Sequence, residues 1–160
     1  WVSTNIPAGT HILVDSQYLR LTNTKEGIQD LQRIDPSALR AADYALLEIP
    51  DERHPRPAHR ILNLHFVSDD MPFRVALDPE FFKKQGFRYF IVEYDYADRR
   101  DLSPQSASLI RGGRLVQRFD NQQSREFETA LDAGGEIANV SLIDLFRINR
   151  LGKFVDIHEF

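Results

Sequence analysis

The sequence predicts an α+β fold with a mixed, largely antiparallel sheet and three to five short helices. Short runs with the two-residue period of β-strands occur along the whole chain, and runs with the period of an α-helix lie between some of them. The two kinds of run follow no regular strand–helix–strand order, which would indicate a parallel α/β sheet. Most neighbouring strand-like runs are separated by short turns, which favour antiparallel pairing.

The length of 160 residues fits one globular domain, and we expect residues 1–160 to form it. Hydrophobic residues make up 42% and charged residues 28% of the chain, as in ordinary soluble domains. The sequence has no apolar run of the roughly 20 residues that a membrane span needs. No signal peptide is visible in this stretch, and the sequence predicts a soluble protein without indicating its compartment.

The first predicted elements are a hairpin and a helix. Residues 11–14 and 18–22 are two β-rich runs separated by a polar turn, which is typical of a hairpin. A helix is predicted over residues 24–34. Asp35 and Pro36 then start a second turn, because Asp is a favoured N-cap and Pro a favoured first helical residue.

Residues 44–49 are apolar and are predicted to be extended, whereas the proline-rich segment 50–57 is predicted to be a surface loop. Two later runs, 59–67 and 87–96, alternate strictly and are predicted to be strands. Their apolar faces should lie in one core, which predicts burial of Leu62, Leu64, Phe66, Phe90, Val92 and Tyr94. The second face of the 87–96 strand is expected to be half polar.

The remaining elements complete the predicted fold. Between the two alternating strands we expect a strand at 73–77 and a helix over 78–86 that ends at Gly86. After a polar loop over 98–105, a hairpin is predicted at 106–119. Helices from about 124–133 and from Ser141, and a closing strand at 154–157, follow in the order of the chain.

The predicted hairpin carries the clearest candidate for partner binding. Gly112 and Gly113 suit a tight two-residue turn, and Arg111, Arg114 and Arg118 would surround its tip. Arginine donors suit carboxylates and phosphates, so such a basic fork would attract an acidic patch on another protein. The alternative is that these charges only keep an edge hairpin from pairing with another chain.

Charge and cysteine content narrow the function classes. The net charge is −4, whereas nucleic-acid binding usually needs a basic surplus, so nucleic acid is an unfavoured partner. The chain has no cysteine, which excludes a disulfide, a thiolate zinc site and a cysteine nucleophile within it.

Weak catalytic candidates lie on the polar faces of the two alternating strands. His65 on one, and Glu93 and Asp95 on the other, could converge for acid/base work or a divalent metal if the strands were neighbours. His59 lies on the same predicted face as His65, but six residues span about 20 Å of strand, too far to share a metal. A solvated sheet face would show the same pattern.

The sequence contains none of the familiar catalytic or nucleotide-binding motifs, and it predicts no metal and no cofactor. We therefore expect a protein–protein interaction module, such as an inhibitor, an adaptor or an assembly component, that binds its partner through the 106–119 hairpin. The alternative is a small hydrolase or transferase that uses the His, Glu and Asp side chains of the polar sheet face.

Overall fold

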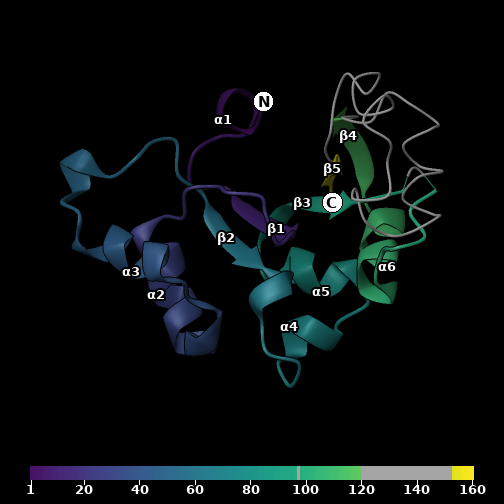
Figure 1. The fold of residues 1–160 in the computed structure, drawn as a ribbon, viewed down its shortest axis with the longest axis horizontal. Coiled ribbons are helices and arrows are strands. Elements are labelled where there is room, and N and C mark those ends of the chain that lie inside the picture. The colour runs from purple at the N-terminus through teal and green to yellow at the C-terminus, as the bar shows by residue number, and fades with distance from the viewer. Residues whose placement is uncertain (97, 120–152) are drawn as a thin grey trace, which may run out of the picture.

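The fold is organised around one five-stranded mixed sheet. A computed structural model describes residues 1–96, 98–119 and 153–160. The strands are β1 (His11–Asp15), β2 (Arg60–Asn63), β3 (Phe87–Tyr94), β4 (Arg114–Phe119) and β5 (Phe154–Glu159). They lie in the order β2-β1-β3-β5-β4 (Figure 1). β1 is parallel to both β2 and β3, whereas β5 is antiparallel to both β3 and β4.

Six α-helices occur in the described residues, together with three 3-10 turns. The helices are α1 (Val2–Asn5), α2 (Lys25–Ile34), α3 (Ala41–Glu48), α4 (Pro72–Val75), α5 (Pro79–Lys84) and α6 (Pro104–Gly112). The 3-10 turns are Pro36–Ala38, Asp51–Arg53 and Leu64–Phe66. The predicted α+β class with a mixed sheet is confirmed. Parallel pairs are as common as antiparallel ones, because the helical connections after β1 and β2 are long enough to return the chain in the same direction.

The two faces of the sheet carry separate apolar clusters. On one face, α2, α4, α5 and α6 pack over a large cluster around Leu13 and Phe90, with Leu31, Phe82 and Leu109 buried from the helices. On the other face, a smaller cluster around Ile12 and Ile91 is covered by α1 and by residues 19 and 21. Figure 1 shows α1 alone above the sheet and the other helices below it.

The predicted core is confirmed except at Phe66, which is only half-buried. Five of the six predicted residues are buried in the large cluster, and Phe66 packs against it. The second face of β3 is half polar as expected, with Tyr89 and Ile91 buried in the smaller cluster and Glu93 and Asp95 only partly buried, although β3 is the central strand of the sheet. The chain from Val2 to Leu21 supplies the side chains that cover this second face.

Side-chain caps explain why several local predictions are confirmed. Thr24 accepts a hydrogen bond from the Gly27 amide at 3.0 Å and starts α2. Asp35 accepts one from the Ser37 amide at 3.1 Å and starts the next turn. α5 ends just before Gly86, whose φ of +87° favours glycine. The closing strand at 154–157 is also present, as the first part of β5.

The predicted hairpin at 11–22 is wrong, because both edges of β1 already pair with β2 and β3. After β1 the chain turns at Ser16, whose hydroxyl accepts hydrogen bonds from the Tyr18 and Leu19 amides at 3.1 and 2.7 Å. The strand predicted at 59–67 ends early, because the Asn63 side chain caps a 3-10 turn through the His65 amide at 3.1 Å.

Two segments predicted to be extended are helical. Residues 44–49 belong mostly to α3, where Asp43 accepts a hydrogen bond from the Arg40 amide at 2.9 Å and stabilises the first turn. Residues 73–75 belong to α4, which Pro72 begins. The proline-rich segment 50–57 is a loop as predicted, apart from one 3-10 turn. The helices predicted near 124–133 and from Ser141 lie outside the described residues.

In the described part of the chain, every helix is too short or too polar to cross a membrane.

Asp35 provides a test of local capping. Its buried carboxylate also accepts hydrogen bonds from the Ser37 hydroxyl at 2.5 Å and from the Ser68 amide at 2.7 Å. Burial alone would raise the pKa of Asp35, but these hydrogen bonds outweigh it and lower the pKa below its usual value. Such a carboxylate stabilises the fold above its unfolded pKa of about 3.9, and the contribution is lost as pH falls through the folded value.

We therefore expect Asp35→Ala to lower the free energy of unfolding by about 2–3 kcal/mol at pH 7, and by less at pH 3. Urea denaturation at both pH values measures the difference. Asp70→Ala, which removes an exposed carboxylate, is the control and should have little effect. An equal loss for Asp35→Ala at both pH values would contradict the role of its charge.

Candidate functional site

The hairpin predicted at 106–119 is wrong, because its first half is helical. Ser103 accepts a hydrogen bond from the Ser106 amide at 3.0 Å and begins α6, with Pro104 at the first helical position. Gly112 then lies against α5: a Cβ atom there would be only 2.1 Å from Cγ of Pro79. The two glycines therefore end a closely packed helix instead of forming a hairpin turn.

The three arginines of the predicted fork are thus separated. Arg111 lies in the last turn of α6 and is exposed, whereas Arg114 and Arg118 lie on β4. Arg114 Nη2 is 2.6 Å from Glu159 Oε2. Arg118 binds Asp156 through two hydrogen bonds of 2.8 and 2.9 Å. Two of the three arginines therefore join β4 to β5, and nothing observed tests their contribution to partner binding.

Asp156 is the most deeply buried carboxylate of this region. It has no exposed surface, and it pairs with Arg99 as well as with Arg118. Burial alone would raise the pKa of Asp156, but the hydrogen bonds from Arg118 and the charges of Arg118 and Arg99 hold it well below its usual range. The side chain is therefore a permanent negative charge that fixes β5 to β4 and to the loop after β3.

The catalytic candidates lie near the carboxyl ends of the parallel strands β2 and β3. His65 and Glu93 line one polar cavity of about 270 Å³, together with Asp15 and Ser16 of the β1 end. They come together because parallel strands end at the same edge, although β1 separates β2 from β3. His59 lies away from this cavity; it is buried, whereas His65 is exposed.

Interactions within the fold already occupy Ser16 and Glu93 of this cavity and the neighbouring Asp95. The Ser16 hydroxyl donates to Glu93 and accepts two backbone hydrogen bonds, so its bonding capacity is used. Lys153 Nζ lies 3.5 Å from Glu93 Oε1 and 3.4 Å from Asp95 Oδ1. In the described ranges, no three His, Asp or Glu side chains are arranged to hold a metal ion. The polar side chains here therefore connect the end of β1 to the end of β3 and to Lys153.

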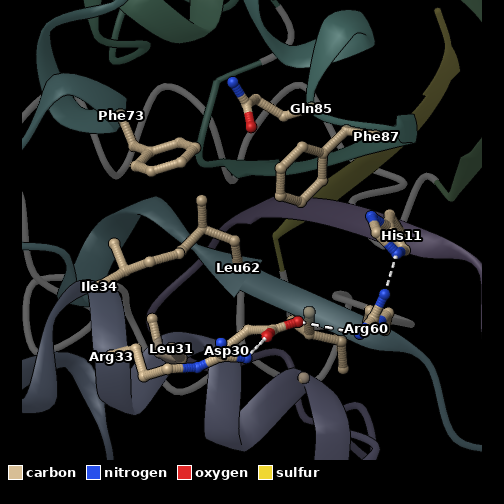
Figure 2. A pocket seen from close by; sticks show the side chains of 12 residues that line it. His11, Asp30, Leu31, Arg33, Ile34, Arg60, Leu62, Phe73, Gln85 and Phe87 are labelled. Carbon is tan, nitrogen blue, oxygen red and sulfur yellow. Dashed lines mark hydrogen bonds and ion pairs between the residues drawn. The ribbon is translucent and has the colours of Figure 1, made fainter.

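A second pocket lies at the amino-terminal edge of the parallel strands (Figure 2). His11, Arg60 and Phe87 are the first residues of β1, β2 and β3, and all three line it. The pocket holds about 290 Å³ between these strands, α2 and the segment from α4 to α5. We call it the amino-edge pocket.

One side of the amino-edge pocket is charged. Arg60 lies at the centre, with Nη2 3.0 Å from Asp30 Oδ2 and Nη1 3.1 Å from His11 Nε2. Asp30 also pairs with Arg33. Figure 2 shows these side chains as a continuous chain of contacts. Because two guanidinium groups share one carboxylate, this side has an excess of one positive charge.

The other side of the pocket is apolar. Figure 2 shows Phe73 and Phe87 opposite Leu31 and Ile34, with Leu62 between them. Leu31 and Leu62 belong to the buried core, whereas Ile34 is 40% exposed. An apolar group can therefore enter next to a positive charge. This pocket does not follow from the sequence, because the predicted, largely antiparallel sheet does not place the first residues of three strands together.

Comparisons with protein-family models, with curated proteins and with solved structures found no match. The candidate site is therefore interpreted from its own chemistry.

The two β4 arginines should differ in their effect on stability. Arg118→Ala removes a partner of a fully buried carboxylate, so we expect a loss of about 2–3 kcal/mol, moderated by the remaining Arg99. Arg114→Ala removes a pair whose arginine side chain is 76% exposed, so the loss should stay below about 1 kcal/mol. Urea denaturation of both variants at pH 7 measures the difference, and equal losses would contradict this interpretation of Asp156.

Proposed function

We propose that this chain is a protein-binding module, and that its amino-edge pocket takes an apolar side chain of the partner together with a neighbouring carboxylate. The observation that carries the proposal is the apolar wall of Phe73, Phe87 and Ile34 beside the positively charged Arg60 and Arg33. The partner surface is thus expected to be acidic, as the sequence also suggested, but the basic groups that meet it are on α2 and β2.

The size of the pocket supports a single side chain as its occupant. Its volume of about 290 Å³ is at the lower limit of the roughly 300–1,000 Å³ of pockets for drug-sized molecules. Protein interfaces often place one large apolar or aromatic side chain of the partner in such a pocket. Burial of a Leu or Phe side chain there would contribute about 1.5–3 kcal/mol.

The charged side would supply specificity. Arg60 is held between Asp30 and His11, and its side chain is 37% exposed, so it is ordered but still accessible. A guanidinium group fixed in this way can recognise a carboxylate without losing much side-chain entropy on binding. Electrostatic complementarity at such a rim favours the right partner and speeds association more than it raises affinity.

The hydrolase or transferase alternative has less support. Its candidate residues His65, Glu93 and Asp95 lie at the other edge of the parallel strands, where Ser16 and Lys153 already satisfy the two carboxylates. No observation favours a catalytic role for these residues over a structural one, so the proposal rests on the amino-edge pocket.

A random peptide library displayed on phage and selected on the 160-residue chain tests this proposal. We expect the selected peptides to share a large apolar residue next to Asp or Glu. The double variant Arg33→Gln/Arg60→Gln should bind the selected peptide at least about tenfold more weakly, because hydrogen bonds to charged groups contribute about 1.5–3 kcal/mol. Isothermal titration calorimetry measures both dissociation constants.

Arg53→Gln is the matched control, because Arg53 is exposed and lines none of the pockets described above. It should leave peptide affinity unchanged. Peptides without a shared apolar and acidic pair, or a selected peptide that binds the double variant with wild-type affinity, would contradict the proposal.

A further inference from the structure

The face of the sheet opposite the large helices carries a groove with a separate chemistry. It holds about 500 Å³, within the range of small-molecule sites. Its floor is apolar and comes from three strands: Ile91 of β3, Phe119 of β4, and Val155 and Ile157 of β5. Trp1, Val2, Leu19 and Leu21 add further apolar walls. We call it the back groove.

One residue that lines the back groove, His59, is a buried histidine without a regular hydrogen bond. His59 is only 2% exposed, and neither ring nitrogen has a hydrogen-bond partner of normal geometry among the described residues. Burial lowers the pKa of His59, an effect that the nearby Pro7 carbonyl partly offsets. The ring is therefore neutral at pH 7, with one N–H donor.

Two arginines, Arg20 and Arg56, also line the groove. Asn23 and His59 form a parallel bridge, and Arg20 and Arg56 each come three residues before one member of it. Both arginines are exposed, both line the groove, and neither forms an ion pair with a described residue. Arg114 and Arg118, by contrast, are paired with carboxylates of β5.

We propose that the back groove binds a fatty-acid-like ligand, a single alkyl chain with a terminal carboxylate. The alkyl chain would lie on Ile91, Val155 and Ile157, where its CH₂ groups are removed from water. The carboxylate would meet Arg20 and Arg56, whose guanidinium groups are exposed. The apolar floor disfavours a polar ligand, and the two guanidinium groups favour an anionic head over a neutral one. This site is independent of the amino-edge pocket.

Trp1 provides a local readout, because it is the single tryptophan of the chain and lines the back groove. We expect dodecanoate, added to the 160-residue chain below its micelle-forming concentration, to shift the Trp1 fluorescence to shorter wavelength in a saturable way. Calorimetry should give one ligand per chain. Dodecanol, which has the same chain length without the charge, should bind at least about tenfold more weakly, because it lacks the charge-assisted hydrogen bonds.

Variants locate the site. Arg20→Gln/Arg56→Gln should weaken dodecanoate binding at least about tenfold with an unchanged melting temperature, because exposed unpaired charges contribute little to stability. Arg53→Gln should bind as the wild type does. Wild-type affinity in the Arg20/Arg56 variant, equal affinity for dodecanol, or no saturable change in fluorescence would overturn the proposal. Loss of binding in Arg33→Gln/Arg60→Gln instead would place the ligand in the amino-edge pocket and would equally overturn it.

Discussion

The central position of β1 is the constraint on which the rest of the structure depends. Ile12, Leu13 and Val14 are almost completely buried, and both edges of the strand are hydrogen-bonded to parallel neighbours. Leu13 faces the large helices, whereas Ile12 and Val14 face α1. A strand that is enclosed on all sides cannot form a hairpin with the residues that follow it. The chain must therefore leave the sheet at Ser16 and cover a face.

The parallel arrangement gives the two ends of β1, β2 and β3 different chemistry. At the carboxyl end, Ser16 and Lys153 satisfy Glu93, and the buried Ser106 donates to Asp15, so the polar groups bond to one another. At the amino end, Arg60 is ordered but still accessible and lies beside apolar side chains. Polar groups that satisfy each other stabilise the fold, whereas accessible ones can bind a partner. This difference is why we propose that a partner binds at the amino end.

Some arginines likewise stabilise the fold, whereas others line pockets where they are accessible to a ligand. Arg99 and Arg118 surround the buried Asp156, and their removal would leave a charge in the protein interior. Arg20, Arg56 and Arg60 line pockets instead, beside apolar surfaces. A count of arginines along the sequence does not distinguish these roles, because they depend on whether the partner carboxylate is buried, as Asp156 is, or accessible, as Asp30 is.

The sequence by itself determined the features that depend on local interactions. The alternation in β3 and β2 identified the core face, and Thr24, Asp35 and Gly86 marked the ends of local elements, because a cap or a two-residue period involves only neighbouring residues.

Only the tertiary structure decided which strands pair and which charges remain accessible. Gly112 and Gly113 suit a hairpin turn as well as a helix end, and the contact with Pro79 selected the helix end. The amino-edge pocket required the parallel pairing of β1 with β2 and β3. Such contacts join residues far apart in the chain, and their free energy depends on packing that no local pattern records.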